Sequence, residues 1–533
     1  MIRVLAVASE IFPLVKTGGL ADVTGALPLA LRRLGKVGAK AAMAIPGAPV
    51  GHWTDPALQA ADSNTSPVMT SGAGGLPQRL SSAGANVITM VPGYPAVLGA
   101  LKDAAAVHQF TDLFGGPATV LRGTAASLDL LVVDAPHLFA RIGNPYLGSD
   151  GNEWPDNGMR FAGLSAAAAA VGAGSVDGLA FDIVHAHDWQ AAMAVVYLHF
   201  HQGPRPGTVL TVHNLAFQGR YRAGLFPRLG LPAAAFSLDG LEYHGDVSFL
   251  KGGLSYADRV TTVSPTYARE ITGIENGMGL DGLLRYRSAA LSGILNGIDD
   301  SVWNPATDML IPAKYSRARL GKRAANKAAL QQRMGLDESP DALLIGVISR
   351  LTSQKGLDML LDQIDHLVAA GMQLAVLGSG DPGLEQAFGA AAEWHLGSVG
   401  CIVGYDEELA HLIQAGSDAL LVPSRFEPCG LTQLYALRYG AIPVVSRVGG
   451  LADSVIDANE AALNAGVATG IQFWPPTPEA LGVGLDRLMA LWQDRPAWER
   501  VQRSGMAADV SWRGPAGRYV KLYQSILAAQ SRN

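Results

Sequence analysis

Cysteine, aromatic residues and positive charge are all scarce in this 533-residue chain. The two cysteines, Cys401 and Cys429, are too few for a disulfide framework and lack the spacing of a zinc site, so a reducing compartment fits the sequence. The formal net charge of -6 provides no basic field for nucleic acid, and no nucleic-acid partner is expected. Any site for an anion must therefore be a local feature.

Long hydrophobic segments are also missing. The longest apolar stretch, at 162–174, is rich in alanine and too short to span a bilayer. Residues 1–12, MIRVLAVASEIF, read as one apolar strand and lack the charged start, long apolar core and cleavage site of a signal peptide. We therefore expect a cytoplasmic protein with no membrane partner.

Short apolar runs alternate with longer helical patterns along the chain, which is typical of βαβ units and a parallel sheet. A chain of 533 residues is also longer than one hydrophobic core usually supports. The pattern predicts an α/β fold of two tandem Rossmann-like, doubly wound domains with an interdomain cleft. The expected strands are 2–8, 86–91, 128–134, 181–187, 208–213 and 259–264 in the first half, and 342–349, 373–378, 401–404, 419–424 and 442–446 in the second.

Turn residues cluster at 292–305, where the two domains are expected to join. We predict an N-terminal domain at 1–293, a C-terminal domain at 294–515, and a final helix at 516–533 that packs back on the N-terminal domain.

Residues 36–83 interrupt the regular pattern with a stretch rich in Gly, Ser, Pro and Thr, which predicts a mobile surface insertion. Within and after it, residues 38–50 resemble residues 84–97, as in a partial duplication. We expect the second copy to supply the core strand, because its Val and Ile suit a buried strand better than the Ala of the first.

A glycine-rich loop, PLVKTGGLADV at 13–23, separates the first strand from a helix expected over about 20–34. The paired Gly18 and Gly19 would let backbone amides approach a ligand closely, and Lys16 favours an anionic one. An ordinary turn is the alternative, since Gly-Gly pairs are common in turns.

Two cationic residues follow a strand of the second half in SRLTSQKG, at 349–356. Arg350 and Lys355 would face the cleft from the carboxyl end of that strand. The pair suits a diphosphate, because Arg binds two oxygens at once while Lys supplies a point charge. A solvated basic helix start is the alternative.

A carboxylate and a helix start come together in PSRFEPCGLTQLYAL, at 423–437. Glu427 precedes a Pro-Cys-Gly turn, so the amides of Cys429, Gly430 and Leu431 can form a helix N-terminus that faces a ligand. A carboxylate beside such donors can bind sugar hydroxyls. Alternatively, Glu427 is only an acidic residue at a helix start.

Five motifs occur in order: KTGGLADV, HAHDW (185–189), TVHNLAFQG (211–219), SRLTSQKG and SRFEPCGLTQL. Together they resemble the bacterial glycogen synthases, relatives of the plant starch synthases, over nearly the whole chain apart from 36–83. That family consists of retaining glycosyltransferases with the two-Rossmann, or GT-B, architecture, and its bacterial members use ADP-glucose to lengthen α-1,4-glucan. The resemblance therefore implies ADP-glucose and glycogen or another α-1,4-glucan as partners, with no cofactor and no metal. The lack of any Asp-X-Asp triplet, the usual metal-diphosphate signature of the other major glycosyltransferase architecture, agrees.

The resemblance also implies roles for residues of both domains around the donor. His213 would lie beside the reacting sugar, Tyr405 would flank the adenine, and Thr432 would face the phosphates. The implied catalytic residues are His213, Arg350, Lys355, Glu427 and Asp22, and the implied substrate-binding residues are Lys16, Gly18, Gly19, Tyr146, Asn214, Asn296, Tyr405, Cys429, Gly430, Leu431 and Thr432.

Some residues of the motifs have a structural alternative or depart from the family pattern. His185, His187 and Asp188 rank below His213 as candidates, because they could equally be structural. Tyr435 stands where many related GT-B enzymes have a Glu that holds the ribose, so the ribose must be held otherwise. Gln190 stands where some bacterial members have His, and we assign no catalytic role to it.

The implied reaction transfers glucose to the nonreducing 4-hydroxyl with retention, by front-face substitution in which the leaving phosphate takes the acceptor's proton. Two alternatives stay open. A sugar-nucleotide epimerase would share the architecture but need no glucan acceptor, and a noncatalytic protein of the same fold would bind glucan or nucleotide without turnover.

Overall fold

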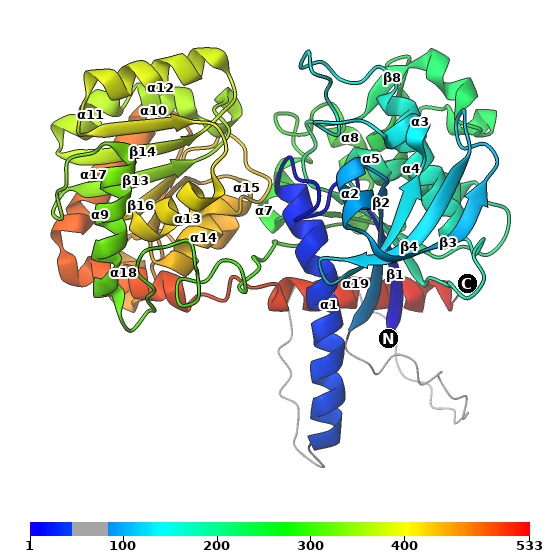
Figure 1. The fold of residues 1–533 in the computed structure, drawn as a ribbon, viewed down its shortest axis with the longest axis horizontal. Helices are drawn as coiled ribbons and strands as arrows, with labels where there is room; N and C mark the ends of the chain where they lie inside the picture. Colours follow the sequence, from blue (N-terminus) through cyan, green and yellow to red (C-terminus); the bar gives the residue numbers. More distant parts are fainter. Residues whose placement is uncertain (45–83, 533) are drawn as a thin grey trace, which may run out of the picture.

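Two α/β halves lie side by side in the computed structural model, which describes residues 1–44 and 84–532 (Figure 1). The first half is built on a nine-stranded sheet and the second on a six-stranded sheet. Helices cover both faces of each sheet, so the prediction of two Rossmann-like, doubly wound domains is confirmed.

The sheet of the first half has the strand order β12-β11-β7-β6-β1-β2-β5-β4-β3. Its strands from β12 to β5 pair in parallel, whereas β3, β4 and β5 form antiparallel pairs at one edge. The bounds are β1 (Ile2–Val7), β2 (Ala85–Pro92), β3 (Lys102–Phe110), β4 (Ala118–Ala125), β5 (Leu128–Asp134), β6 (Ile183–His187), β7 (Gly207–Val212), β11 (Arg259–Thr262) and β12 (Leu291–Gly293). A separate small sheet contains β8 (Arg220–Arg222), β10 (Asp246–Ser248) and β9 (Glu242–Tyr243).

Alternate side chains of β1 enter two different cores, as expected when both faces of a parallel sheet are covered. Leu5 and Val7 belong to the core beneath α4 and α5, while Val4 and Ala6 belong to the core beneath α1 and α19. The helices of this half are α1 (Gly19–Ala44), α2 (Pro95–Ala100), α3 (Pro136–Phe139), α4 (Asn157–Gly172), α5 (Asp188–His199), α6 (Phe249–Tyr256), α7 (Pro265–Glu270) and α8 (Asp281–Tyr286).

The second half has an entirely parallel sheet with the order β15-β14-β13-β16-β17-β18. Its strands are β13 (Leu343–Ile348), β14 (Met372–Gly378), β15 (Val399–Val403), β16 (Ala419–Val422), β17 (Ile442–Ser446) and β18 (Ile471–Phe473). Its helices are α9 (Arg323–Met334), α10 (Leu357–Leu361), α11 (Ile364–Ala369), α12 (Pro382–Trp394), α13 (Glu407–Gly416), α14 (Thr432–Tyr439), α15 (Gly449–Ser454), α16 (Glu460–Ala465), α17 (Pro478–Gln493) and α18 (Arg495–Ala507).

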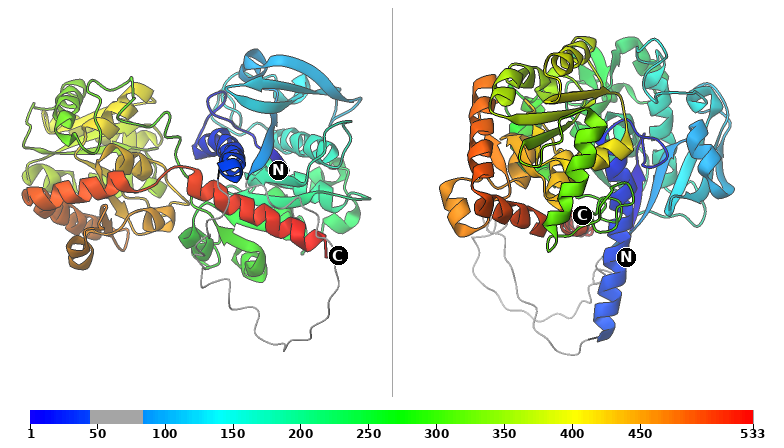
Figure 2. Two further views of the ribbon diagram at one scale, coloured as in Figure 1. Left: turned by 90° about the horizontal axis from the view of Figure 1, so that it is seen from below. Right: turned by 60° about the vertical axis from the view of Figure 1, so that its left-hand side comes forward.

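The last helix, α19 (Arg513–Gln530), belongs to the first half although it follows the second in the chain. Figure 2 shows the red C-terminal segment passing from the second half across to the first. Tyr519, Tyr523 and Ile526 of α19 are buried against β1, β2 and α1. The exact divisions at residues 293 and 515 stay predictions.

Every strand expected from the sequence is present, and the 84–97 copy does supply core strand β2. The expected end of α1 near residue 34 is wrong, because the helix continues to Ala44. Residues 36–44 of the expected insertion are therefore helical, and its remainder, 45–83, lies outside the described residues. Within the described part of the chain, no helix combines the length and apolar character needed to cross a membrane.

Both sheets have a point where the chain reverses its direction of winding. β1 lies between β2 and β6, and β13 lies between β14 and β16. Open α/β sheets bind ligands outside the carboxyl ends of the strands at such points. The segments that follow β1, β6, β13 and β16 are therefore the ones to examine for a site.

Candidate active site

The glycine-rich loop after β1 is held in place by one buried carboxylate. Glu10, with 3% of its surface exposed, accepts hydrogen bonds from the Thr17 amide at 2.5 Å and the Thr17 hydroxyl at 2.7 Å. The Tyr146 hydroxyl donates to the same carboxylate at 2.5 Å and also contacts Ser9 Oγ at 2.7 Å. Tyr146, expected near the donor or the acceptor, thus lies where its hydroxyl supports the loop.

The basic residue and the glycines of the loop lie at the surface, with Gly19 close to the second half. Lys16 to Gly19 are exposed, and Lys16 Nζ lies 2.8 Å from the carboxylate of Asp22 in the first turn of α1. Burial raises the pKa of Asp22, while Lys16 acts in the opposite direction. A Cβ built on Gly19 would lie 3.9 Å from Leu431 of the second half, so the helix start faces the other domain at close range.

Three histidines form a row, two on β6 and one directly after the neighbouring strand β7. His185 and His187, two residues apart on β6, are stacked with ring centroids 4.2 Å apart, and His187 Nδ1 shares a hydrogen bond of 3.0 Å with His213 Nε2. His185 bonds to Thr211 at 2.6 Å and to Tyr523 of α19 at 2.8 Å. The C-terminal helix α19 therefore contacts the histidine row through Tyr523.

Burial keeps these imidazoles neutral. It lowers the pKa of His187 to about 3 and the pKa of His213 well below its usual value, with His187 adding to the effect on His213. Asp188 follows them in the chain, and its carboxylate accepts the amides of His213 at 2.6 Å and Asn214 at 3.4 Å. Burial raises the pKa of Asp188 to about 7, although those two amides lower it in part. Its contacts give Asp188 a structural role in positioning the TVHN segment.

The second half contributes a buried ion pair. Lys355 Nζ lies 2.5 Å from Glu427 Oε2, and Ser424 Oγ donates to the same oxygen at 2.9 Å. The side chains of Lys355 and Glu427 are only 18% and 8% exposed. The two motifs SRLTSQKG and SRFEPCG thus meet at the carboxyl ends of β13 and β16.

Close backbone contacts fix the position of this pair. Gly356 has a φ of +69°, and a Cβ there would lie 2.0 Å from the carbonyl oxygen of Pro423. Gly449, with a φ of +42°, similarly approaches the carbonyl of Glu427, where a Cβ would lie at 1.9 Å. Glycine is required at both positions by conformation and by space.

The turn after Glu427 leaves amide donors available. Among the described residues, the amides of Cys429, Gly430, Leu431 and Thr432 have no hydrogen-bond acceptor. The last three residues are only partly buried and lie at the start of α14. Such unpaired amides at a helix start favour an anion or a hydroxyl oxygen.

The remaining expected residues differ in how directly they face the site. Arg350 is exposed and forms no ion pair with any described residue, so its guanidinium is available to a ligand. Asn296 lies beside the Cys429 thiol, whose pKa burial raises to about 12, and its own Oδ1 is buried without a partner among the described residues. Tyr405 is 75% exposed, and its hydroxyl donates to Glu407.

The sequence alone did not reveal an aromatic stack beneath Glu407. The Trp303 ring lies between His411 and Tyr435, with centroids 3.9 Å from each and interplanar angles of 11° and 17°. His411 bonds to Asp308 at 2.7 Å. Burial opposes the charge on His411, but hydrogen bonds to Asp308 and Glu407 outweigh it and raise the pKa to about 9. Tyr435 thus packs in the core of the second half.

The two halves also touch directly beside the site. Ser264 Oγ donates to the Pro428 carbonyl at 2.7 Å. Thr266 donates to Asp453 through its amide and its hydroxyl, each at 2.7 Å. Through these contacts, the segment after β11 holds the Glu427 loop against the first half.

The structure places the expected residues in two groups, one in each half. Lys16 and Asp22 pair after β1, with His213 after β7, whereas Lys355 and Glu427 pair after β13 and β16. Glu10 and Trp303 were missed, because each is a single residue without a motif. The position of Glu10, a carboxylate shortly after a buried strand, was the sequence feature that could have marked it as a candidate.

Comparison with known proteins gives two family matches in tandem. The model described as "Starch synthase catalytic domain" matches residues 3–44 and 68–286, and the model described as "Glycosyl transferases group 1" matches residues 331–504. The two matches fall on the two halves of the fold.

Full-length relatives give the same result. A glycogen synthase of Rhodopseudomonas palustris strain BisB18 is 54% identical over 532 residues, covering 100% of this chain and 99% of that protein. A glycogen synthase of Methylocella silvestris is 53% identical over 526 residues, covering 99% of each chain. Among solved structures, the catalytic domain of starch synthase IV from Arabidopsis thaliana bound to ADP and acarbose is 29% identical, with a TM-score of 0.82 and 99% of each chain covered. The chain therefore belongs to the starch and glycogen synthase family of GT-B glycosyltransferases.

Proposed function

We propose that this chain is a glycogen synthase that transfers glucose from ADP-glucose to the nonreducing end of an α-1,4-glucan, with retention of the anomeric configuration. The observation that supports the proposal is the presence of cations and unpaired amides after strands of both sheets, with Gly19 of the first half near Leu431 of the second. Lys16 belongs to the first half, while Arg350, Lys355 and the start of α14 belong to the second. The similarity to a structure bound to ADP supports an adenine nucleotide as the donor's leaving group.

Departure of ADP is the difficult step, because negative charge grows on the diphosphate as the bond to the anomeric carbon breaks. In this proposal Arg350 binds two phosphate oxygens and Lys355 a third, while Lys16 joins them from the opposite domain. Preorganised charge in a cleft with little water is often the largest catalytic contribution. Thr432 and the amides of Cys429, Gly430 and Leu431 would supply neutral donors beside these cations.

The sugar itself would lie between Glu427, Asp22 and His213. Glu427 is oriented by Lys355 and Ser424, so one of its oxygens is held while the other can accept a glucose hydroxyl. His213, kept neutral by burial, can stabilise positive charge at the anomeric carbon without repelling it. Asn214 and Asn296 would line the same space.

Retention through two displacements would need a carboxylate nucleophile beneath the anomeric carbon. The carboxylates of the described motifs have other partners: Asp22 pairs with Lys16, Asp188 accepts two amides, and Glu427 pairs with Lys355. These contacts favour front-face substitution, in which the departing phosphate takes the acceptor's proton. Gly18 and Gly19 leave room for that phosphate, and Tyr405 would flank the adenine.

The test is incubation of the purified chain with ADP-glucose, with and without glycogen, beside a parallel reaction with UDP-glucose. We expect ADP release that depends on glycogen, faster turnover with ADP-glucose, and a new α-1,4 linkage by NMR. Isomerised sugar nucleotide without acceptor would instead indicate an epimerase, and binding without turnover would indicate a noncatalytic protein. A β linkage in the product would refute retention.

A further inference from the structure

Tyr405, proposed above to flank the adenine, is an exposed side chain on a fixed backbone. The Gly404 amide donates to the Gly378 carbonyl at 2.9 Å, and the next residue, Asp406, caps the start of α13. By contrast, 75% of the Tyr405 surface is exposed, and within the described residues its hydroxyl bonds to Glu407 alone. The direction of the Tyr405 ring therefore depends on where Glu407 lies.

Glu407 is held by a second contact inside the second half. Its Oε2 accepts the Tyr405 hydroxyl, and its Oε1 lies 3.7 Å from His411 Nε2, one turn further along α13. The other ring nitrogen, Nδ1, bonds to Asp308 at 2.7 Å, and the Tyr439 hydroxyl donates to the same Asp308 oxygen at 2.5 Å. Polar contacts thus run without a break from buried Asp308 through His411 and Glu407 to the exposed ring. We refer to these four residues, Asp308, His411, Glu407 and Tyr405, as the α13 network.

His411 is a cation with a fixed orientation. Burial lowers its pKa, but Asp308 and Glu407 outweigh this effect and raise the pKa to about 9, so the ring is charged at neutral pH. The Trp303 ring stacks on it with the centroids 3.9 Å apart and an angle of 11° between the planes. With one face covered and Nδ1 bonded to Asp308, the ring presents Nε2 to Glu407. A fixed positive charge therefore holds Oε1 of Glu407, which leaves Oε2 for Tyr405.

The α13 network lies near the glycine-rich loop of the other half. His411 lowers the pKa of Glu407 most, against the effect of burial, and Tyr405 and Lys16 lower it further. Glu407 in turn adds to the rise in the pKa of Asp22, whose main cause is burial. The start of α13 is therefore close enough to the start of α1 for their charges to interact. A base stacked on Tyr405 would lie beside the phosphate site proposed for Lys16.

Stacking requires the tyrosine ring to lie flat against the base. A freely rotating exposed ring would lose that freedom when the base binds, whereas a ring that is already held in place would not. We infer that Glu407, fixed by His411 and Asp308, is a positioning residue that holds the Tyr405 ring in the orientation that stacks on the donor's adenine. The inference rests on the proposed function. It gives three residues a role in donor binding without contact to the donor.

The first test measures the affinities of ADP and of inorganic pyrophosphate by calorimetry. We expect Tyr405→Phe and Glu407→Ala each to weaken ADP binding by roughly three- to tenfold, the usual cost of ordering one free side chain. Both changes break the same contact, so the double variant should lose no more affinity than either single variant. Pyrophosphate has no base, and its affinity should stay at the wild-type value. Glu407→Gln keeps an oxygen that can accept the Tyr405 hydroxyl, so its smaller expected loss guards against a folding defect.

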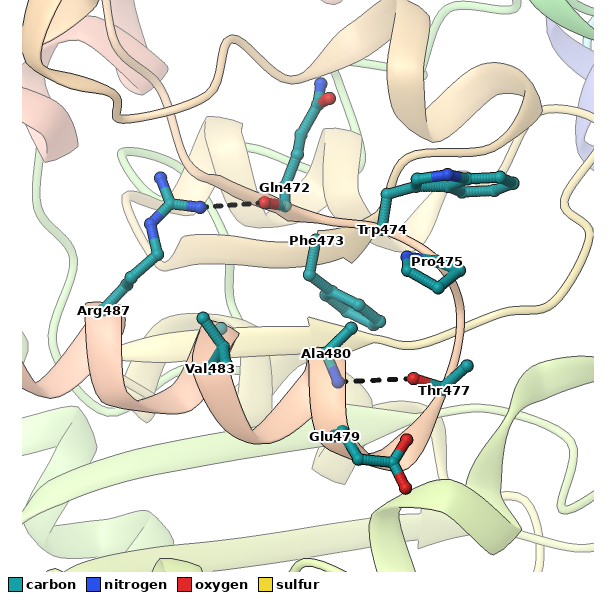
Figure 3. Close-up of a pocket in the computed structure, with 10 residues that line it drawn as sticks. Gln472, Phe473, Trp474, Pro475, Thr477, Glu479, Ala480, Val483 and Arg487 are labelled. Carbon is teal, nitrogen blue, oxygen red and sulfur yellow. Dashed lines mark hydrogen bonds between the residues drawn. The ribbon is translucent and has the colours of Figure 1, made fainter.

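Two carboxylates in the same half serve as controls. Glu408 follows Glu407 in the first turn of α13, but it is exposed and bonds to no described residue. Glu479 is an exposed carboxylate in the first turn of α17, where it lines a depression that contains no member of the α13 network (Figure 3). Glu408→Ala removes a negative charge from the same helix turn as Glu407→Ala, and Glu479→Ala removes one from a different helix. Both controls should bind ADP as wild type does.

Steady-state kinetics separate this role from the chemical step. We expect Glu407→Ala to raise the KM for ADP-glucose by a similar factor while kcat and the KM for glycogen stay at their wild-type values. Unchanged ADP affinity in Glu407→Ala, or losses that multiply in the double variant, would overturn the inference. An equal loss of pyrophosphate affinity would also overturn it, because Glu407 would then act on the diphosphate through Lys16.

Glycogen-dependent release of ADP by wild type tests the proposed function separately. ADP binding that depends on Glu407 in a protein without that release would refute the proposed function and support the inference. Normal release, with ADP binding indifferent to Glu407, would do the reverse. A wild-type protein that does not bind ADP would overturn both.

Discussion

Removal of the ammonium group of Lys355 is expected to lower both kcat and the free energy of unfolding, by different amounts. Lys355 Nζ lies 2.5 Å from Glu427, and Ser424 is the other group within residues 1–44 and 84–532 that bonds to that carboxylate. Lys355→Ala therefore removes a cation proposed to bind the diphosphate and also leaves a buried carboxylate without its counter-charge. A single variant thus perturbs two separate properties.

The expected magnitudes follow from the geometry. Loss of a preorganised group that stabilises transition-state charge lowers kcat by about 10²–10³, or roughly 2.7–4 kcal/mol. Removing one partner of a buried ion pair destabilises a protein by roughly 3–5 kcal/mol, and we expect the lower end because Lys355 keeps 18% of its side chain exposed. Lys355→Ala combined with Glu427→Ala removes the unpaired carboxylate, so it should recover much of the stability and none of the turnover.

The assay measures kcat with ADP-glucose and glycogen together with urea unfolding for each variant. Lys322→Ala is the control, because Lys322 is exposed in the same half and forms no ion pair with a described residue. We expect wild-type turnover and stability for this control. Near-normal turnover of Lys355→Ala would refute its assigned charge, and equal stability of the single and double variants would refute the importance of the buried pair.

Three further predictions test other parts of the structure. His411 should stabilise the second half fully below pH 6.5, and this contribution, roughly 3 kcal/mol, should be lost as the pH rises through its folded-state pKa of about 9. Urea unfolding at pH 6 and pH 9.5 measures the loss of unfolding free energy between the two pH values. We expect Asp308→Asn to reduce this loss. A loss in Asp308→Asn as large as that in wild type would contradict the role of His411. Tyr523→Phe leaves buried His185 without one partner and should cost roughly 1–3 kcal/mol of stability, so an unaltered melting temperature would argue against that contact. Lys16→Ala should lower kcat by about tenfold, less than Lys355→Ala, because the side chain of Lys16 is 29% exposed and its charge is partly screened; initial rates at saturating ADP-glucose decide this.

The strands that carry the site were predictable because they are buried on both faces. β13 forms one continuous apolar run, and β1 is apolar apart from the exposed Arg3 near its start, which is the pattern of a covered parallel strand. By contrast, β3 is largely exposed at the antiparallel edge of its sheet, so its residues carry no such signal and it was missed. The end of α1 was also misjudged, since the helix continues ten residues beyond residue 34, to Ala44.

The site was predictable where a motif follows a strand, because the carboxyl ends of parallel strands share one edge. This reasoning located Lys355 and Glu427 in one cleft. Their pairing depends on the conformation of two loops, which no local pattern encodes. The stack of Trp303 with His411 and Tyr435 joins three distant segments and is visible only in three dimensions.

The placement of α19 has a consequence for the order in which the chain can fold. Tyr523 and Ile526 complete a core whose other members include Val4 and Val23, and Ile526 occupies the space beside Gly207. Domains generally begin to fold as they emerge during synthesis. Here α1 covers only part of this face of the first half's sheet until α19 has been synthesised, so the second half can finish folding earlier. A ribosome-bound chain that ends before α19 would therefore expose apolar surface on its first half that the full-length protein keeps buried.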